Sequence, residues 1–204
     1  MAMEKEILSL SEGWKYSASD SPDVHDPTSW QNAQPLPTSI HLDLAANGTI
    51  PDPFTAKNEQ LVQWVATKTW VYEKPFTVPP RLYSNSNQKV ILVFEGLDTC
   101  TTVRLDGNVV LETKNMFLGH RIDITEQIRS NQTAETEIHT LQIVFHNAEE
   151  KAVEEMQRHS EQSWFSFHFG SKRLALRKAQ YHFVRHGDQL SVSLLCRSIV
   201  ANYR

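Results

Sequence analysis

The sequence predicts an all-β protein built as an antiparallel β-sandwich or jelly roll. Several short stretches place apolar residues at every second position, a period that indicates strands with one buried face. Turn-forming residues separate these stretches at regular spacing, and one segment alone has a clear helical pattern. Many short strands with frequent turns and little helix are typical of antiparallel sheets packed face to face.

The strands are located by alternation and by turn residues. Residues 69–78 alternate, and Pro75, which lacks a backbone donor, indicates an edge position or a bulge within this strand. Residues 89–96 form a nearly continuous apolar run of strand length. The Asp-Gly pair at 106–107 separates two β-rich runs and predicts a hairpin, because such turns need positive φ. Residues 137–146 alternate again and predict a further strand.

One helix is predicted after the last of these strands. Asn147 is suited to cap its amino end, and Glu150 stands three residues on as the capping-box partner. Apolar residues follow at helical spacing, and Glu154 can pair with Arg158. We expect this helix to end near His159.

The segment before the first long strand has a different composition. Residues 20–60 are rich in Pro, Asp, Asn and Ser. Proline fixes φ and removes a backbone donor, so we expect no long regular element there. Composition leaves open whether this region is an ordered loop or a mobile one.

Composition excludes several classes of function. The formal net charge of -4 gives no basic face for nucleic acid. No run approaches the ~20 apolar residues that span a bilayer, and the first residues lack the pattern of a secretory signal. Cys100 and Cys196 indicate no disulfide framework. We therefore expect a cytoplasmic protein without nucleic-acid or membrane partners.

Motifs for cofactors and metals are absent from the sequence. No glycine-rich phosphate loop, G-x-S-x-G elbow, CxxC pair or HExxH occurs. His159, His168, His182 and His186 are close in sequence, but their spacing does not place them on one helix or strand face. Surface or core roles are therefore favoured for them over a metal site. We expect no cofactor and no bound metal.

Aromatic residues are more suggestive of function. Trp164, Phe165, Phe167 and Phe169 gather after the predicted helix, and Trp64 follows a polar loop. Aromatic faces beside carboxylates and amides suit sugars, whose C–H faces stack while their hydroxyls form hydrogen bonds. The same rings also suit a sandwich core or a domain interface, and the residues alone favour this second interpretation.

Four stretches of the chain form an ordered set. The first comprises residues 50–54, 57–59 and 62–64 with Trp70 and Tyr72, and the second comprises 94–99, Val103 and 105–107. The third comprises 115–117 and 120–125, and the fourth is 176–183. Together they resemble the amino-terminal domain of fungal-type intracellular β-mannosidases of glycoside hydrolase family two. The resemblance implies a galactose-binding-domain-like jelly-roll β-sandwich with one or two short helices.

The resemblance also divides the chain. A β-mannosidase-like sandwich domain covers residues 1–183, and a tail over 184–204 matches nothing in the family. In the family, a Gly-Trp-Asp-Trp-Gly-Pro loop follows residue 183 and reaches the active site. This chain has Val-Arg-His-Gly-Asp over 184–188 instead, so no sugar contact is assigned to Asp188. The tail run 190–195 alternates partly like a strand, and either replaces a missing terminal strand or stays loose.

The family activity is hydrolysis of terminal non-reducing β-D-mannose residues by two carboxylates on a TIM barrel. Such a barrel takes ~250 residues, more than this chain could add to its sandwich. Glu59, Glu95 and Glu161 do not match the family's catalytic positions. We therefore assign no catalytic residue and expect the chain to be inactive by itself.

The candidate site residues fall into two groups. The candidates for substrate contact in a complete relative belong to a polar loop region beside an aromatic ring, and are Asp52, Asn58, Glu59 and Trp64. An equally weighted alternative is that this loop caps the sandwich and packs against the barrel. The candidates for orienting the lost loop are Arg177, Gln180 and Tyr181.

Three functions stay open at this point. The chain is a non-catalytic sugar-binding-type domain of a β-mannosidase, a stand-alone carbohydrate-binding module, or a structural interaction domain without glycan affinity. We favour the first. The expected partners are β-mannoside glycans, bound weakly, and a second copy of the chain, because an exposed barrel-facing surface favours self-association.

Overall fold

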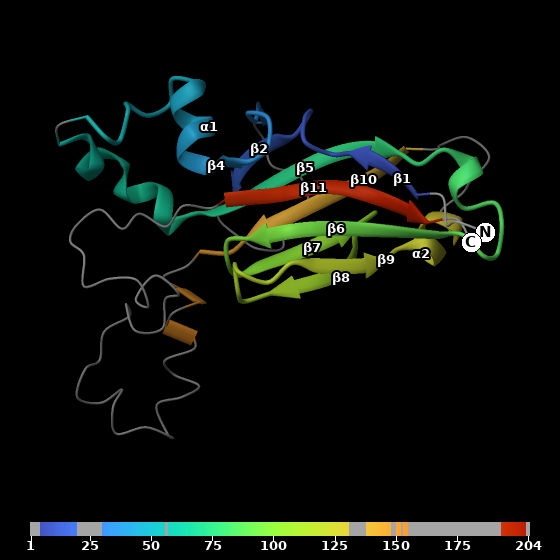
Figure 1. Cartoon of the computed structure of the whole chain (residues 1–204). Coiled ribbons are helices and arrows are strands. Elements are labelled where there is room, and N and C mark those ends of the chain that lie inside the picture. The colour runs from blue at the N-terminus through green and yellow to red at the C-terminus, as the bar shows by residue number, and fades with distance from the viewer. Residues whose placement is uncertain are drawn as a thin grey trace.

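The computed structural model describes residues 5–19, 30–55, 57–130, 138–147, 150–151, 153–154 and 193–202. These residues form two antiparallel sheets that lie face to face, so the predicted β-sandwich is confirmed (Figure 1). In the described part of the chain, no helix is long and apolar enough to cross a lipid bilayer.

Both sheets are assembled from strands that are distant in sequence. The first has the order β1 (Lys5–Ser9), β11 (Ser193–Asn202), β6 (Lys89–Leu97), β9 (His120–Asp123), and β11 also pairs with β4 (Thr38–Ser39). The second has the order β3 (Gln31–Asn32), β2 (Lys15–Ser19), β5 (Thr69–Thr77), β10 (Ile138–Phe145), β7 (Thr101–Leu105), β8 (Asn108–Thr113). From β6 onward the chain passes repeatedly between the sheets, as in a jelly roll.

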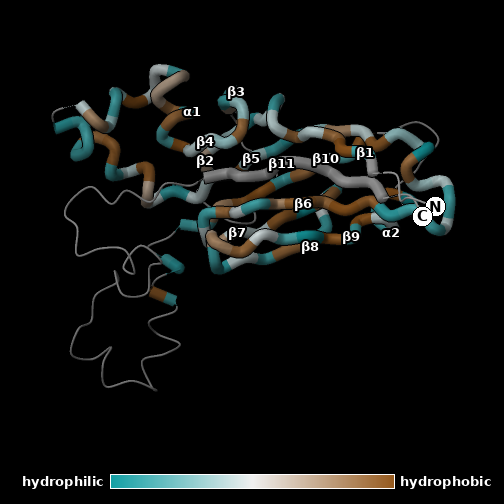
Figure 2. Tube along the Cα trace, in the orientation of Figure 1, coloured by the Kyte–Doolittle hydropathy of each residue, from teal (hydrophilic) through white to brown (hydrophobic). Residues whose placement is uncertain are grey.

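Alternate residues of the long strands fill the space between the sheets. On β6, Val90, Leu92 and Phe94 are buried, while Ile91 and Val93 between them are half-buried. In the same way, β5 and β10 contribute Trp70, Tyr72, Phe76, Leu141, Ile143 and Phe145. The period-two pattern thus produces one core, and apolar stretches can be followed along the strands in Figure 2.

The strands predicted from alternation and from the apolar run at 89–96 are confirmed. Residues 69–78 contain β5, 89–96 lie in β6, and 137–146 contain β10. The pairing of β5 with β2 stops at Glu73, whereas its pairing with β10 continues through Pro75. One side of β5 therefore has no described partner strand at Pro75, which is the edge position that a residue without an N–H requires.

The predicted hairpin is also confirmed. Asp106 and Gly107 join β7 to β8 with φ angles of 50° and 82°. The Asp106 carboxylate reaches β10, where Oδ1 accepts a hydrogen bond from the backbone N of Thr140 at 2.7 Å. Its Oδ2 lies 2.7 Å from Nδ1 of His139, which is buried. One side chain therefore fixes the turn to the neighbouring strand.

Replacing Asp106 with alanine should lower the free energy of unfolding by about 2 kcal/mol, because the buried His139 ring and the Thr140 amide lose their acceptor. Denaturant unfolding followed by circular dichroism measures this loss. Asn108→Ala, at an exposed position of the same turn, is the control and should change stability by less than about 0.5 kcal/mol. Equal losses for the two variants would contradict the anchoring role.

Short helices connect the strands. The described residues include α1 (Ile40–Ala46), α2 (Thr125–Ser130) and the 3₁₀ helices η1 (Asn58–Thr67) and η2 (Pro80–Leu82). The amino end of α1 is capped by Ser39, whose Oγ accepts a hydrogen bond from the Leu42 N at 3.4 Å. The region over residues 20–60 thus holds short elements where it is described, as its composition predicted.

The predicted helix start at Asn147 is found. The backbone N of Glu150 donates to Asn147 Oδ1 at 3.3 Å, and the described residues from Glu150 to Glu154 are helical. Glu154 pairs with Lys151 at 2.7 Å. The predicted partner Arg158 and the remainder of the predicted helix lie outside the described residues.

Residues 193–202 supply a strand in the middle of the first sheet. β11 pairs with β1 on one side and with β6 on the other, and the start of β11 also pairs with β4. Of the two alternatives left open for the tail run 190–195, the structure shows a strand, which begins at Ser193. The division between a domain and a tail at residue 183 stays a prediction.

Candidate functional site

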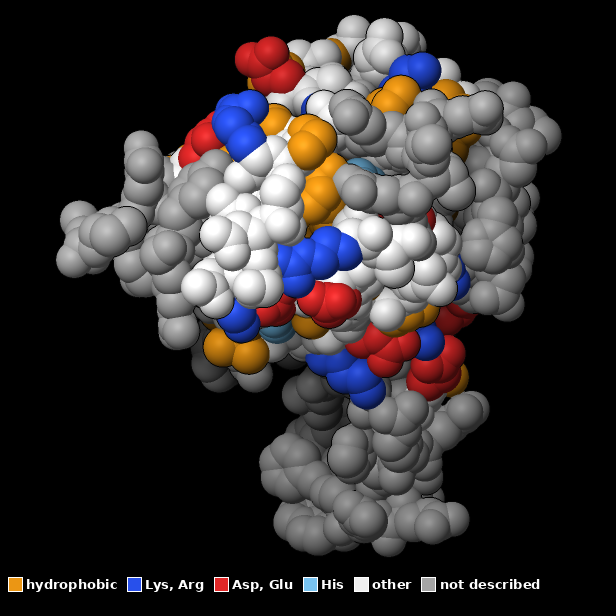
Figure 3. All heavy atoms as spheres, turned by 90° about the vertical axis from the view of Figure 1, so that its right-hand side faces the viewer, with side chains coloured by type: hydrophobic (Ala, Val, Ile, Leu, Met, Phe, Trp, Pro, Cys, Tyr) orange, Lys and Arg blue, Asp and Glu red, His pale blue; other side chains and the backbone are white. Residues whose placement is uncertain are grey.

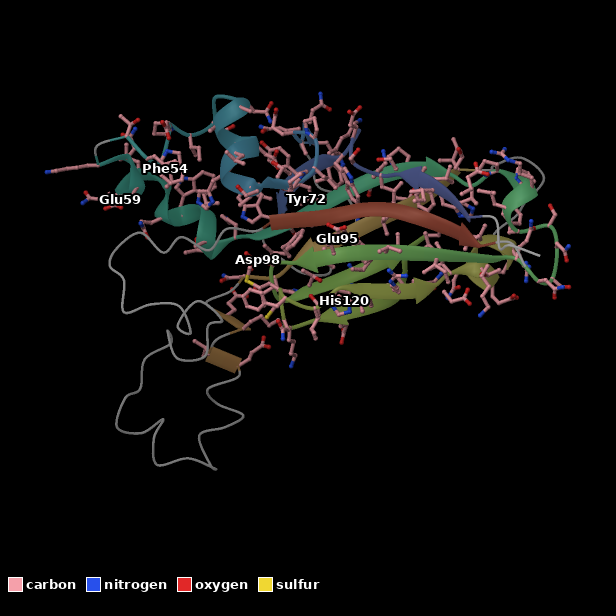
Figure 4. All side chains as sticks on the ribbon, viewed as in Figure 1. Phe54, Glu59, Tyr72, Glu95, Asp98 and His120 are labelled. Carbon is pink, nitrogen blue, oxygen red and sulfur yellow. The ribbon has the colours of Figure 1, made fainter. Side chains whose placement is uncertain are left out.

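One end of the sandwich gathers the loops that carry the predicted site residues. The strand registers place Trp70 beside Phe145, Phe145 beside Thr101, and Thr101 beside Thr113, so one row crosses four strands. Immediately beyond this row lie η1, the β6–β7 turn and the β8–β9 loop. Figure 4 shows Phe54 at the tip of this end and Asp98 on its β6–β7 turn. We call it the α1–η1 end.

A buried carboxylate holds α1 in place. Asp43 Oδ1 accepts hydrogen bonds from the backbone N of Gln34 at 2.7 Å and from Oγ1 of Thr38 at 2.8 Å. Its Oδ2 accepts a hydrogen bond from the Tyr72 hydroxyl at 2.6 Å. Burial raises the pKa of Asp43, and the three hydrogen bonds oppose that rise. Both oxygens are engaged and the side chain is fully buried, so Asp43 is an anchor with no access to a substrate.

A second polar cluster extends this anchor to β2. The Tyr16 hydroxyl donates to Gln31 Oε1 at 2.6 Å and accepts a hydrogen bond from Asn47 Nδ2 at 3.0 Å. Asn47 Nδ2 also donates to the backbone O of Asn32 at 2.9 Å. The Tyr16 and Tyr72 rings are stacked, with centroids 5.7 Å apart. The carboxyl end of α1 is therefore tied to β2 and β3.

The 3₁₀ helix η1 has a buried side and an exposed side. Val62 and Val65 are buried, and the backbone O of Val65 accepts a hydrogen bond from Trp70 Nε1 at 2.8 Å. With three residues per turn, Leu61 and Trp64 form a separate row, and they are 63% and 39% exposed. The Trp64 ring lies 6.1 Å from the Trp70 ring. The core thus fixes η1 so that Leu61 and Trp64 face outward.

The loop before η1 is folded by its own polar side chains. Asp52 accepts hydrogen bonds from the backbone N of Phe54 at 2.9 Å and from Thr55 Oγ1 at 3.0 Å. Asn58 Nδ2 donates to the backbone O of Asp52 at 2.9 Å. Phe54 is left 91% exposed at the tip of this loop. The structure therefore gives Asp52 and Asn58 a local role in shaping the loop.

The predicted site residues are only partly brought together. Asp52 and Asn58 are in contact, and Glu59 and Trp64 follow on η1, so all four lie in one continuous segment. Their contact with substrate stays a prediction. The three candidates for orienting the lost loop, Arg177, Gln180 and Tyr181, lie outside the described residues. So do the aromatic cluster at 164–169 and the four histidines, which are His159, His168, His182 and His186.

Two further loops complete the α1–η1 end. In the β6–β7 turn, the backbone O of Thr99 accepts a hydrogen bond from Thr113 Oγ1 at 2.7 Å, which ties this turn to the end of β8. In the β8–β9 loop, Asn115 Oδ1 accepts a hydrogen bond from the backbone N of Phe117 at 2.9 Å. This local bond leaves Phe117 and Leu118 exposed.

Of the glutamates considered for glycoside hydrolysis, Glu59 and Glu95 lie within the described residues and Glu161 lies outside them. Asp43 and Asp98 are the buried carboxylates within the described residues, and Asp43 is fully engaged as an anchor. A retaining glycosidase needs two carboxylates ~5–5.5 Å apart across the sugar-binding position. Glu95 is exposed on β6 and Glu59 is half-buried on η1, at separate places in the fold (Figure 4). In the same residues, no group of His, Cys, Asp and Glu is arranged to hold a metal ion.

The architecture matches that of a known family. The family model described as glycosyl hydrolase 2 galactose-binding domain-like matches residues 14–186. The chain belongs to this family. The match covers the anchored α1–η1 end as well as most strands of both sheets, so the galactose-binding-domain-like jelly roll implied by the resemblance is confirmed.

The relatives of this glycosyl hydrolase 2 domain include β-mannosidases. It is 42% identical over 174 residues to Beta-mannosidase B of Emericella nidulans, and 36% identical over 177 residues to Beta-mannosidase B of Thermothelomyces thermophilus. Among solved structures, the β-D-mannosidase of Dictyoglomus thermophilum is similar, with a TM-score of 0.75 and 29% identity. The predicted resemblance to the amino-terminal domain of these enzymes is confirmed.

The chain is short compared with these relatives. The matches cover 85%, 87% and 97% of the chain but 19%, 19% and 22% of the three proteins. The glycosyl hydrolase 2 domain therefore spans about a fifth of the length of the relatives it matches.

Proposed function

We propose that this chain is the non-catalytic amino-terminal domain of a β-mannosidase, where it supports the site that hydrolyses terminal non-reducing β-D-mannose residues. One observation carries the proposal: the chain is 42% identical to Beta-mannosidase B of Emericella nidulans over a segment that makes up 19% of that protein. The remainder of such a relative is long enough for a TIM barrel, the part that holds both catalytic carboxylates in the family.

The α1–η1 end suits a supporting role. Asp43 and Asn47 hold α1, while Asp52 and Asn58 fold the loop before η1, so these polar groups are engaged in hydrogen bonds within the domain. These hydrogen bonds fix the geometry of α1 and of the loop before η1. A site to which several domains contribute requires such rigid supporting elements.

Among the four candidates for substrate contact, Glu59 and Trp64 are the better placed. Both lie on η1, whose position the buried Val62 and Val65 determine, and the Trp64 indole is 39% exposed. We therefore propose that Glu59 and Trp64 border the sugar site in a complete enzyme, and that Asp52 and Asn58 act by shaping the loop.

The proposal also covers what the chain binds by itself and where in the cell it is found. Weak binding of β-mannoside glycans is expected of the chain alone, because one exposed indole beside one carboxylate offers few contacts to a sugar. A cytoplasmic location is supported by the presence of only two cysteines in 204 residues, since small secreted domains are often rich in disulfides.

A domain exchange tests the proposed function. The full chain of 204 residues, which includes β1 and β11, replaces the matching segment of Beta-mannosidase B from Emericella nidulans, and hydrolysis of p-nitrophenyl β-D-mannoside is measured. We expect kcat/KM within about tenfold of the parent enzyme, a difference of about 1.4 kcal/mol in transition-state stabilisation. A folded chimera without activity would contradict a supporting role for this domain in a β-mannosidase.

A titration of the isolated chain with mannobiose separates the alternatives. The proposal predicts dissociation constants in the millimolar range or weaker. Micromolar binding would instead support a stand-alone carbohydrate-binding module. Since the titration needs no catalytic partner, its result is independent of the domain exchange.

A further inference from the structure

The carboxyl end of α1 carries an Asn-Gly pair whose two members the fold requires for different reasons. Gly48 has a φ of 71°, in the left-handed region that favours glycine after a helix. Its backbone N donates to Ala45 O at 3.0 Å, and Thr49 N donates to Leu44 O at 2.8 Å, which closes the last turn. Asn47 supplies the side-chain amide that ties this turn to β2 and β3. The local structure therefore selects a dipeptide with a chemistry of its own.

Asparagine is a chemically labile residue, and a glycine after it allows the side chain to lose its nitrogen without an enzyme. The backbone N of Gly48 attacks Cγ of Asn47, its proton passes to Nδ2, and Nδ2 leaves as ammonia. Water then adds to one carbonyl of the cyclic imide, and the ring opens to aspartate or isoaspartate. Gly48 lies in open space, with nothing within 4 Å of where a Cβ would be, and Asn47 is exposed to water.

The folded anchor restrains both reacting groups. Asn47 Nδ2 donates to the Tyr16 hydroxyl at 3.0 Å and to the backbone O of Asn32 at 2.9 Å. The attacking Gly48 N is held by its hydrogen bond to the last turn of α1. These three hydrogen bonds oppose the attack as long as α1 is closed. A helix end opens more often than the whole domain unfolds, because fewer contacts are lost.

The product of the reaction cannot restore the anchor. A carboxylate at position 47 has no proton to donate to the Asn32 carbonyl or to the Tyr16 hydroxyl oxygen. The single Tyr16 proton is donated to Gln31 Oε1 at 2.6 Å, so it cannot satisfy the new carboxylate as well. A negative charge is also unfavourable at the carboxyl end of a helix. Isoaspartate adds a methylene to the main chain and displaces the hydrogen bonds that end α1.

We propose that Asn47 is a site of spontaneous deamidation, which is controlled by opening of α1 and leaves the carboxyl end of α1 detached from β2 and β3. The change runs in one direction, since ammonia is lost. The chain offers a reference in Asn32, because the methyl group of Ala33 hinders attack by the following backbone N. The reaction needs only water, so it is independent of the proposed role in a β-mannosidase.

Mass spectrometry of the full chain after incubation in mildly alkaline buffer measures the conversion. Trypsin releases residues 16–57 as one peptide, so Asn47 and the reference Asn32 are compared in the same spectrum. Asn47 should convert and Asn32 should not. The folded chain should convert at least about tenfold more slowly than a synthetic peptide of residues 43–52. Equal conversion at both positions, or none at Asn47, would overturn the site, and a rate equal to that of the peptide would overturn its control by α1.

Two variants separate opening of α1 from unfolding of the whole domain. Tyr16→Phe removes one hydrogen-bond partner of the Asn47 amide and should raise the conversion rate by about threefold or more. Asp106→Ala loosens the hairpin at the opposite end, without a contact to α1, and should leave the rate unchanged. Equal acceleration by the two variants would mean that conversion follows global unfolding and would overturn the control by α1.

A second measurement covers a Tyr16→Phe chain that does not fold. The exposed substitution Asn47→Asp places the product in the full chain, and hydrogen exchange at the backbone amides of 47–49 should become about tenfold faster or more. The matched control Asn108→Asp makes the same charge change at the opposite end, where Figure 3 shows charged side chains of both signs, and should leave this exchange unchanged. Unaltered exchange in Asn47→Asp, or equal increases in both variants, would overturn the inference.

Discussion

A chain that stops after residue 192 should show no cooperative thermal unfolding transition. β11 lies between β1 and β6 and also pairs with β4, so its removal divides the first sheet and leaves unpaired edges on all three strands. The inner residues of β6, including Leu92 and Phe94, would also lose cover. We expect a loss of about 5 kcal/mol or more, comparable with the whole stability of a typical domain.

Circular dichroism melts and limited proteolysis measure this effect. The control is a chain that stops after Asn202, which keeps all of β11 and should melt as the parent does. A peptide of residues 193–202 added to the shortened chain should restore part of the transition. An unchanged Tm after removal of β11 would contradict its place in the sheet.

Asp43→Ala should lower the free energy of unfolding by about 3–5 kcal/mol, because each donor left without its acceptor in a buried site costs about 1–3 kcal/mol. The substitution leaves the buried Tyr72 hydroxyl, Thr38 Oγ1 and the Gln34 amide without the acceptor that joins them. A loss of this size lowers the Tm of a domain this large by about 10 °C, measurable by calorimetry. Asp52→Ala, at an exposed acceptor, is the control and should cost about 1 kcal/mol.

The same residue gives a pH dependence with a defined sign. Burial raises the pKa of Asp43 in the folded chain above its unfolded value of 3.8, so the folded state holds this proton more tightly. The contribution to stability is fully present below pH 3.8 and is lost as the pH rises through the folded pKa. Asp43→Asn removes this titration.

The stability difference between the parent chain and Asp43→Asn should therefore shift in favour of the parent as the pH falls from 7 toward 4. Urea denaturation at a series of pH values measures it. A difference that stays constant with pH would show that the Asp43 pKa is the same in the folded and unfolded chain.

Local patterns predicted the elements whose causes are local. The Asp-Gly pair at 106–107 determines its hairpin through positive φ, and Asn147 caps its helix through a hydrogen bond three residues away. Alternation identified β5 and β10, and a nearly continuous apolar run of strand length identified β6. Pro75 indicated an open strand edge for the same kind of reason, since a missing N–H restricts pairing wherever it occurs.

The elements that local patterns missed depend on distant contacts. Asp43 anchors α1 through Tyr72, 29 residues away, and no local motif marks such a carboxylate. η1 is fixed by the burial of Val62 and Val65 and by the Trp70 indole, which belongs to the next strand. Without these contacts, the sequence before residue 69 has the composition of an irregular loop.

The candidate site was predicted only in part for the same reason. Trp64 could be selected from its polar surroundings, but the exposure of Phe54 and Leu61 follows from how the loop and η1 are anchored. The 3₁₀ period separates Leu61 from the buried Val62 by a single residue, so composition alone could not assign either one to the surface.

The most direct test of the account is hydrolysis of p-nitrophenyl β-D-mannoside by the purified chain of 204 residues, with folding verified by circular dichroism. The account predicts no turnover above a mock preparation from the folded chain, because the catalytic carboxylates belong to another part of a β-mannosidase. Turnover that copurifies with the chain would mean that two of its own carboxylates form an active site, and would contradict the assignment as a supporting domain.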